Sequence, residues 1–212
     1  MRGIVAERLA IVGGDAAGMS AASAARRREP ELDVMAFERG PYTSFSACGI
    51  PFFVGGLFDD SDRLVARSPD VPGVQRAEPA RTIDAADRFR AALQRGGESA
   101  VVVGGGYIGL EMAEALTRRG LSLTLVEQAG QVMATLDEDM AAHVQDAAER
   151  VGIDVRLGAE LQEVSEHAVR VDGEDLPADH VVMATGVRPA TTLARRAGLE
   201  LGESGALRVD DH

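Results

Sequence analysis

The sequence predicts an α/β protein with two Rossmann-like dinucleotide-binding folds, one complete and one partial. Two glycine-rich turns, residues 13–18 and 104–109, each follow a short apolar run and precede a run of small or helix-forming residues. This order of buried strand, tight turn and helix is typical of parallel sheets that bind a dinucleotide pyrophosphate. Each unit then runs into a second apolar stretch that closes on a glutamate, Glu38 or Glu127. A carboxylate about 20 residues after the turn meets a ribose hydroxyl pair, so both units carry the parts of a dinucleotide site.

Composition narrows the class of protein further. The 212 residues are 45% hydrophobic, which is ample for a core, and the formal net charge is −12. Strong negative charge disfavours nucleic acid and anionic membrane surfaces, so neither is predicted as a partner. A single cysteine excludes a disulfide framework and favours a reducing compartment. Without a leader-like N-terminus or an apolar run of membrane-spanning length, the expectation is a soluble cytoplasmic protein.

The first unit opens with an apolar run at residues 9–12, predicted to be a buried parallel strand. Small residues continue past the turn and predict a helix that packs closely on the sheet. Asp15 replaces the middle glycine of the G-x-G-x-x-G pattern, which normally lets the backbone approach a pyrophosphate. The second strand is predicted over residues 32–37 and ends at Glu38.

A loop at residues 44–51 holds the only cysteine, Cys48, between the two dinucleotide units. Serines, glycine and proline surround this cysteine, which predicts a loop and not an apolar core segment. A short helix is predicted over residues 51–57. The polar, irregular stretch at residues 59–79 is the predicted linker, and a helix over residues 84–94 follows it.

The second unit carries a full G-x-G-x-x-G turn between a predicted strand at residues 100–103 and a predicted helix at 110–119. Its next strand, over residues 121–126, ends at Glu127, and Gln128 follows with no arginine beside it. A carboxylate in that place accepts hydrogen bonds from the adenine-ribose hydroxyls and repels a 2′-phosphate. The sequence therefore predicts that NADH binds better than NADPH.

The remaining segments extend the second unit. They predict a helix at residues 137–150, a strand at 153–157, and strands at 164–171 and 180–184 around the turn Asp172-Gly173. The four histidines show no ligand spacing, so no metal site is predicted.

Three stretches together resemble the FAD-dependent pyridine nucleotide-disulfide oxidoreductases. Residues 11–20 are similar to the family's FAD turn, residues 42–51 to the redox loop of its single-cysteine branch, and residues 102–114 to its NAD(P)H turn. That branch holds coenzyme A-disulfide reductases, NADH oxidases and persulfide reductases. The resemblance implies four ranges: a partial FAD-binding domain with the redox loop at 1–70, a linker at 71–80, a complete NAD(P)-binding domain at 81–189, and a truncated return to the FAD domain at 190–212.

The resemblance also implies roles for individual residues. Cys48 is expected to be the catalytic thiolate. The implied substrate-binding residues are Ser20, Arg27 and Ser44; two further contact positions, which are typically amides in the family, are Ala24 and Ala47 here. The implied FAD-binding residues are Gly13, Gly14, Asp15, Ala16, Ala17, Gly18, Glu38 and Arg39. The implied residues of the NAD(P)H site and its surroundings are Gly104, Gly105, Gly106, Tyr107, Ile108, Gly109, Glu127, Thr185 and Gly186, with Tyr107 as an aromatic gate near the flavin.

The chain differs from the family in what it lacks. It has one Ala-Thr-Gly segment where the family has two, and it stops before the family's Gly-Asp flavin motif and dimerisation domain. We therefore interpret it as an internally deleted, C-terminally truncated member of a family whose intact relatives are homodimers.

A single cysteine limits the chemistry that the resemblance implies. Electrons passing from NAD(P)H through FAD to sulfur have no second cysteine with which to form an internal disulfide. A mixed disulfide with an external thiol implies a coenzyme A-disulfide or persulfide reductase, whereas a sulfenic acid implies an NADH oxidase. The expected partner is a small-molecule disulfide, a persulfide or dioxygen. Two alternatives are a catalytically inactive nucleotide-binding remnant and a monooxygenase-like flavoprotein, and the second gives no reason for the cysteine loop.

Overall fold

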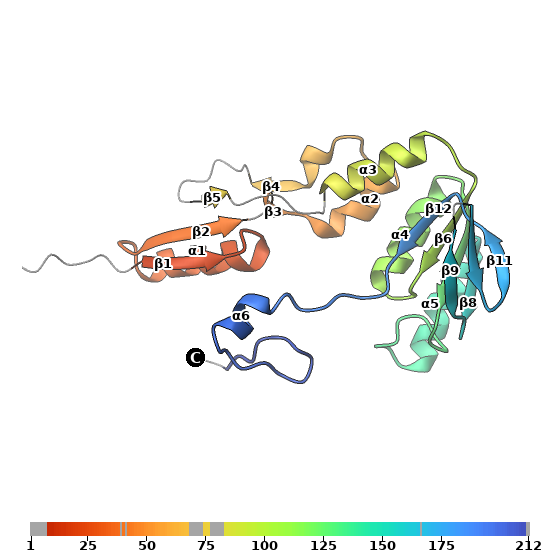
Figure 1. The fold of residues 1–212 in the computed structure, drawn as a ribbon. Helices are drawn as coiled ribbons and strands as arrows, with labels where there is room; N and C mark the ends of the chain where they lie inside the picture. Colours follow the sequence, from red (N-terminus) through yellow and green to blue (C-terminus); the bar gives the residue numbers. More distant parts are fainter. Residues whose placement is uncertain are drawn as a thin grey trace, which may run out of the picture.

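The computed structural model describes residues 8–38, 40, 42–67, 74–76, 83–165 and 167–210. Within these ranges the chain is an α/β protein with one parallel sheet toward each end of an elongated molecule (Figure 1). The predicted fold class is confirmed. Among the described residues, no helix is long and apolar enough to cross a membrane.

The first sheet has three parallel strands in the order β1-β2-β5. Its elements are β1 (Arg8–Val12), α1 (Ala16–Arg28), β2 (Asp33–Glu38) and β5 (Val74–Arg76). The last strand lies inside the range predicted to be a linker. The core of this unit is small, consisting of Ile11, Met19 and Ala36 with a few partly buried neighbours. β1 pairs only with β2 among the described strands, and four of its five residues are exposed.

The cysteine loop forms a small unit between the two sheets. β3 (Thr43–Phe45) pairs antiparallel with β4 (Val65–Arg67), and between them lie η1 (Ala47–Gly49), α2 (Ile50–Val54) and η2 (Ser61–Leu64). Cys48 lies in η1 and is exposed. The predicted short helix is present but ends earlier than expected, because Gly55 and Gly56 close it and Gly56 adopts a φ of +82°.

The second sheet has four parallel strands in the order β12-β6-β7-β8. This unit comprises α3 (Ile83–Gln94), β6 (Ser99–Val103), α4 (Tyr107–Arg118), β7 (Ser122–Glu127), α5 (Glu138–Arg150), β8 (Ile153–Leu157) and β12 (His180–Met183). Four of the five β6 residues are buried, as expected for a central parallel strand covered on both faces. α4 begins at Tyr107 and not at residue 110, because the helix starts inside the glycine motif with Gly106 as its N-cap.

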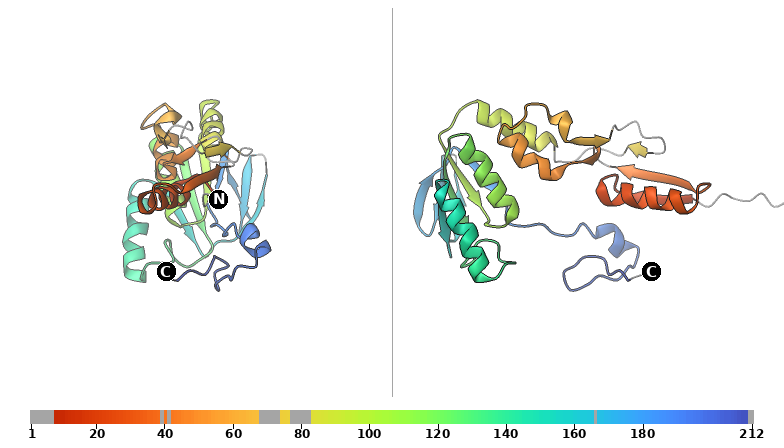
Figure 2. Two further views of the ribbon diagram at one scale, coloured as in Figure 1. Left: turned by 90° about the vertical axis from the view of Figure 1, so that its left-hand side faces the viewer. Right: turned by 180° about the vertical axis from the view of Figure 1, so that it is seen from behind.

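A three-stranded antiparallel sheet covers the face of the second sheet that is opposite α4 (Figure 2). Its strands are β9 (Leu161–Val164), β10 (Ala168–Val171) and β11 (Glu174–Pro177), in the order β11-β10-β9. The single strand predicted over 164–171 is wrong: Ser165 donates to the Ala168 carbonyl from both its backbone nitrogen and its hydroxyl, and this turn separates β9 from β10. The strand across the Asp172-Gly173 turn is β11, whereas residues 180–183 pair in parallel with β6.

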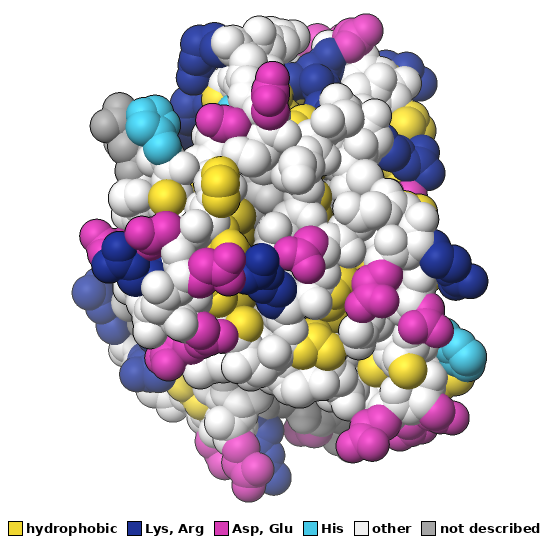
Figure 3. All heavy atoms as spheres, turned by 90° about the vertical axis from the view of Figure 1, so that its right-hand side faces the viewer, with side chains coloured by type: hydrophobic (Ala, Val, Ile, Leu, Met, Phe, Trp, Pro, Cys, Tyr) yellow, Lys and Arg dark blue, Asp and Glu magenta, His cyan; other side chains and the backbone are white. Residues whose placement is uncertain are grey.

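The outer face of this end carries interspersed charges (Figure 3). Arg170 pairs with Asp175 at 2.8 Å and with Glu163 at 3.6 Å, and Arg156 pairs with both Asp154 and Glu174. These pairs are largely exposed, so they contribute solubility more than stability.

The main hydrophobic core extends beyond the second sheet. Phe53 and Val54 of α2 and Leu64 of η2 are 1–2% exposed and belong to the same buried cluster as Leu116 and Leu125. The helix that follows Cys48 is therefore packed into the core of the second unit. The tail beyond β12 runs back along the molecule and holds α6 (Thr192–Arg196) (Figure 1).

Candidate functional site

The second glycine turn has a geometry that only glycine accommodates at two positions. Gly104 has a φ of +110°, and its backbone nitrogen donates to the carbonyl of Val126 at 2.8 Å. A β-carbon on Gly109 would lie 1.8 Å from the carbonyl oxygen of Gly104, so α4 approaches the turn backbone directly. This close packing aims the N-terminus of α4 at the end of β6, where backbone N–H groups and the helix dipole favour a phosphate.

The carboxylate of Glu127 is fixed against this turn. Its Oε2 accepts a hydrogen bond from the backbone nitrogen of Gly105 at 2.6 Å, and its Oε1 accepts one from Ala129 at 2.7 Å. Each carboxylate oxygen has a further lone pair. The group is therefore held in one orientation while keeping acceptor capacity for hydroxyl groups.

A cleft of about 490 Å³ opens at the carboxyl ends of the parallel strands. Six of the residues expected at the NAD(P)H site line it: Gly104, Gly106, Tyr107, Glu127, Thr185 and Gly186. Three others lie behind or beside the wall. Gly105 bonds to Glu127 and to the amide of Met133, Gly109 packs on Gly104, and Ile108 is 44% exposed on α4.

The cleft also has a wall that the sequence motifs did not indicate. Met133, Ala134 and Thr135 follow β7, and Ala159, Glu160 and Leu161 follow β8. Both segments come after the carboxyl end of a parallel strand, which is where ligands bind in open α/β sheets. That positional rule, applied to every strand, would have identified them.

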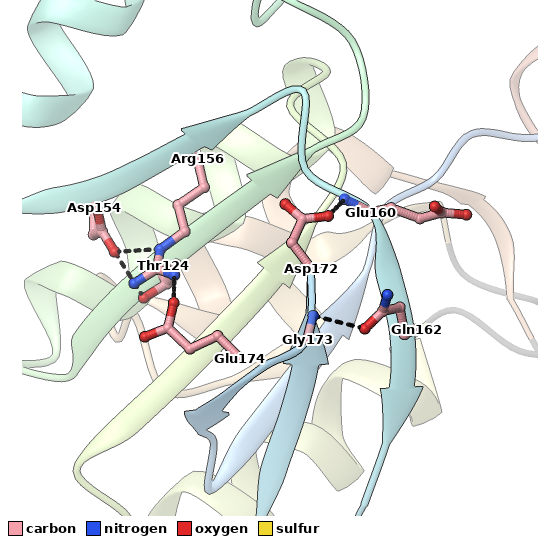
Figure 4. A network of polar contacts seen from close by, with 8 residues as sticks. All are labelled: Thr124, Asp154, Arg156, Glu160, Gln162, Asp172, Gly173 and Glu174. Carbon is pink, nitrogen blue, oxygen red and sulfur yellow. Dashed lines mark hydrogen bonds and ion pairs between the residues drawn. The ribbon is translucent and has the colours of Figure 1, made fainter.

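The wall after β8 is fastened to the antiparallel sheet (Figure 4). The Glu160 backbone nitrogen donates to the carboxylate of Asp172 at 3.0 Å, and the Asp172 nitrogen donates back to the Glu160 carbonyl at 3.2 Å. Next to this pair, Gly173 donates to the side-chain oxygen of Gln162 at 2.8 Å. The hairpin turn thus fixes the backbone of a cleft-lining residue.

The first glycine turn repeats the geometry of the second. Gly13 has a φ of +106° and donates to the Phe37 carbonyl at 2.8 Å, and a β-carbon on Gly18 would lie 1.7 Å from the Gly13 oxygen. Glu38 accepts from the nitrogens of Gly14 and Gly40, both at 2.6 Å. The two expected dinucleotide turns are therefore built on the same plan.

Asp15 marks the difference between the two turns. It stands at the N-cap of α1, and one of its carboxylate oxygens is buried with no hydrogen-bond partner among the described residues. A buried polar atom of this kind is normally satisfied by an ordered water or a ligand. Ala16 and Ala17 begin α1 as expected. Arg39, also expected in this site, lies outside the described residues.

The three residues expected to bind substrate lie together. Ser20, Arg27 and Ser44 line one pocket of about 280 Å³, with Ala16, Met19 and Ser23. Ser44 has a φ of +53°, unusual for serine, and its nitrogen donates to the Gly14 carbonyl at 3.2 Å. That bond ties the start of the cysteine loop to the first glycine turn. Cys48 itself lines neither this pocket nor the larger cleft.

Comparison with known proteins finds a family whose model matches this chain. The model of the family described as "Pyridine nucleotide-disulphide oxidoreductase" matches residues 65–212, more than half of the chain.

Relatives match most of this chain but not most of their own length. The NAD(P)H coenzyme A polysulfide/persulfide reductase of Pyrococcus horikoshii is 28% identical, over 97% of this chain and 59% of the relative. The NADH oxidase of Methanocaldococcus jannaschii is 29% identical, over 92% of this chain and 58% of the relative. The crystal structure of reduced Bacillus anthracis CoADR-RHD superposes on this chain with a TM-score of 0.90 at 27% identity. The match covers 97% of this chain and 48% of that one.

The chain therefore spans about three fifths of the length of the curated relatives it matches. The alignment with the Pyrococcus protein runs over 269 residues, which is longer than the 212-residue chain. The relative thus has residues inside the aligned region that this chain lacks, and the interpretation as an internally deleted sequence is confirmed.

Proposed function

The chain belongs to the pyridine nucleotide-disulphide oxidoreductase family, and we propose that it carries the electron path from NAD(P)H through FAD to Cys48, which reduces a small disulfide such as coenzyme A disulfide. The observation that carries this proposal is the shared pocket of Ser20, Arg27 and Ser44 beside the cysteine loop. Because the chain spans only part of its relatives, the activity is proposed for the whole protein of which these residues form the electron path.

NADH would bind in the cleft of the second unit. The pyrophosphate would meet the backbone N–H groups at the start of α4, and Glu127 would accept hydrogen bonds from the adenine ribose. Tyr107 is 63% exposed and lines the cleft, so its ring is available to cover the nicotinamide end. The fixed orientation of the Glu127 carboxylate supports this assignment.

The first turn fits a second dinucleotide. The residues that would hold FAD are the glycines at 13, 14 and 18, the start of α1 and Glu38, because they repeat the hydrogen bonds of the second turn. The unpartnered oxygen of Asp15 gives a further polar contact to satisfy. When bound, FAD supplies the step between hydride transfer and transfer of an electron pair to sulfur.

Cys48 would react by thiol–disulfide exchange. Its thiolate attacks one sulfur of an external disulfide, forms a mixed disulfide and releases the first thiolate. Two electrons that originate from NAD(P)H then cleave the Cys48 sulfur–sulfur bond and release the second thiolate. The balance is one NAD(P)H and one proton consumed per disulfide, giving two thiols. Arg27 and the hydroxyls of Ser20 and Ser44 would orient an anionic or polar disulfide in the pocket.

Two alternatives from the same family use the same cysteine. In an NADH oxidase, two electrons from NADH would reduce dioxygen to hydrogen peroxide, which would oxidise the Cys48 thiolate to a sulfenic acid and leave water as the other product. In a persulfide reductase, the Cys48 thiolate would attack the outer sulfur of a persulfide, form a cysteine persulfide and release the thiolate. Both are supported by relatives whose names state these activities. A third alternative is a nucleotide-binding remnant without turnover.

A single assay series separates these possibilities. The protein is loaded with FAD and given NADH in three separate assays. Two are run under nitrogen, one with coenzyme A disulfide and one with a persulfide. The third is run in air without a sulfur acceptor. The proposal predicts the fastest NADH oxidation with the disulfide and its loss in Cys48→Ser. Preference for air or for the persulfide selects the corresponding alternative, and no turnover with any acceptor supports the remnant.

A further inference from the structure

Two arginines connect the helix that follows Cys48 to the helices of the second unit. Arg119 caps α4 and donates its Nε–H to the carbonyl of Val54, the last residue of α2. Arg90, from α3, donates to the carbonyl of Phe58 at 2.9 Å and pairs with the carboxylate of Asp59. We call Arg90 and Arg119 the arginine clamp.

Arg90 is buried and Arg119 is half-buried. The Arg90 side chain is 10% exposed, and its guanidinium lies 4.5 Å from the centre of the Phe53 ring. Burial lowers the pKa of Arg119 from its ordinary value, and the nearby charge of Arg90 lowers it further. A guanidinium partly removed from water is stabilised by its hydrogen bonds, which Arg119 makes to the end of α2 and Arg90 makes to the residues just after it.

The two glycines that end α2 also approach α4 closely. A β-carbon on Gly55 would lie 3.3 Å from the β-carbon of Ala115, and one on Gly56 would lie 3.3 Å from the Arg119 guanidinium. Phe53 is 2% exposed in the core beneath. Tight packing together with two charged hydrogen-bond donors leaves α2 little freedom to shift against α4.

This packing is connected to the thiol at one end and to the nucleotide cleft at the other. η1 runs directly into α2, and the Ile50 nitrogen donates to the Ala47 carbonyl, so Cys48 follows any movement of α2. α4 begins at Tyr107 in the cleft wall and ends at the clamp. Its 12 residues span about 18 Å at 1.5 Å per residue.

We propose that Arg90 and Arg119 are positioning residues for Cys48, which set the place of the thiol relative to the nicotinamide cleft through α2 and α4. The inference rests on the proposed role of Cys48 as the point where electrons leave. The groups of a catalytic site need to be held within about 0.5 Å of their productive geometry, and a helix that is free to rock does not hold Cys48 in that way. The clamp gives the exposed loop a rigid support.

The test uses the fact that Cys48 is the only cysteine, so a nitroxide label attaches at one place. Arg119→Met and Arg90→Met remove the donors and keep an unbranched stem. We expect a more mobile electron paramagnetic resonance spectrum from the label in both variants. We also expect the amides of α2 to exchange with solvent faster by on the order of tenfold or more, the size of one lost hydrogen bond to a charged group. The amides of β6 should exchange as in the parent.

Arg118→Met is the matched control, because it makes the same charge change on the same helix: Arg118 lies beside α2 and pairs with Glu114, but it donates no hydrogen bond to α2 or to residues 55–59 among the described contacts. It should leave spectrum and exchange unchanged. Arg119→Lys keeps a cation and a donor, so it should recover part of the parent behaviour. If the methionine variants do not fold, the lysine variant decides: a spectrum more mobile than that of the parent supports the clamp.

The proposal is overturned if the folded Arg119→Met and Arg90→Met proteins give the parent spectrum and the parent rate of α2 exchange. The same result in Arg119→Lys overturns it where that is the deciding variant. An equal effect of Arg118→Met would overturn it as well. Neither readout requires flavin or turnover. A protein with the expected spectra but no disulfide reduction would contradict the proposed function and retain the clamp.

Discussion

The carboxylate of Glu127 lies 2.6 Å from the backbone nitrogen of Gly105, so the acid at the end of β7 and the glycine turn after β6 form one hydrogen-bonded unit. The bond from Ala129 to the other carboxylate oxygen fixes the group from the opposite side. Neither residue is free to move without the other. Nucleotide choice and turn geometry are therefore coupled in this cleft.

The first prediction concerns that choice. NADH should bind more tightly than NADPH, because Glu127 accepts from ribose hydroxyls and repels a 2′-phosphate. A charged hydrogen bond contributes about 1.5–3 kcal/mol, so the preference should be roughly tenfold or more. Fluorescence titration of both nucleotides measures it. Glu127→Ala should lose the preference, Glu160→Gln should keep it, and tighter NADPH binding by the parent would refute the assignment.

The second prediction separates two glycines of one motif. Gly109→Ala puts a β-carbon 1.8 Å from the Gly104 oxygen, so it should lower the melting temperature strongly or prevent folding. Gly106→Ala meets nothing within 4 Å and should keep the parent melting temperature. Because Gly106 lines the cleft, its methyl group should weaken NADH binding. Thermal unfolding and NADH titration of both variants test this, and equal melting temperatures would contradict the packing described.

The third prediction concerns the thiol. In protein loaded with flavin, Cys48→Ser should abolish disulfide reduction, because exchange requires a thiolate. Bleaching of the flavin absorbance by NADH should persist, since hydride transfer does not involve the sulfur. Stopped-flow absorbance and steady-state assays give the two quantities. Continued turnover with coenzyme A disulfide in the variant would show that Cys48 is not the exit for electrons.

The fourth prediction concerns flavin content. Among the described strands, β1 lies at the edge of a three-stranded sheet, and Val12 at its end is 70% exposed. An open edge with exposed apolar residues favours association with other chains over a closed flavin site. The 212-residue chain should therefore purify with well under one flavin per chain and sediment as a mixture of species. A monomer carrying one flavin per chain would contradict this expectation.

The fifth prediction concerns pH and stability. Asp179 accepts hydrogen bonds from the backbone nitrogens of Glu98 and Ser99 and from the Ser99 hydroxyl. These bonds hold the pKa of the Asp179 carboxyl below its ordinary value of 3.8, and the bond from Glu98 is the largest cause. A carboxylate with a lowered folded-state pKa stabilises the fold above its unfolded-state pKa, and that stability is lost as pH falls through the folded-state value. Asp179→Asn should thus melt at a lower temperature at pH 7.

The difference between parent and Asp179→Asn should narrow below about pH 4, where the unfolded carboxylate begins to protonate. Asp146→Asn, on the exposed face of α5, is the matched control and should follow the parent at every pH. A constant difference in melting temperature from pH 7 down to acid pH would show that the charge of Asp179 has no part in its effect.

Local signals in the sequence were sufficient for the two turns. Gly104, Gly109 and Glu127 could be assigned because the motif requires a positive φ, a close helix approach and an acid at fixed spacing, and all three are properties of a short segment. The same holds for Gly13 and its repeat of this geometry. The pocket of Ser20, Arg27 and Ser44 was expected from a family resemblance, and the structure brings those residues together.

Features that depend on distant contacts could not be predicted. The cleft wall at Glu160 is fixed by Asp172, and the separation of β9 from β10 depends on a turn at Ser165 within a run that alternates like one strand. The packing of Phe53 against the second unit had no signal either, because a short apolar stretch does not state which of two sheets it will join.

The position of α2 in the larger core has a consequence for proteolysis. Phe53, Val54 and Leu64 are 1–2% exposed there, and burying side chains of this kind contributes on the order of 1.5–3 kcal/mol each. A fragment that starts at Ile83 would leave their places in the core empty. A protease that cuts between Arg67 and Ile83 should therefore yield two pieces that stay together under native conditions and separate only in denaturant.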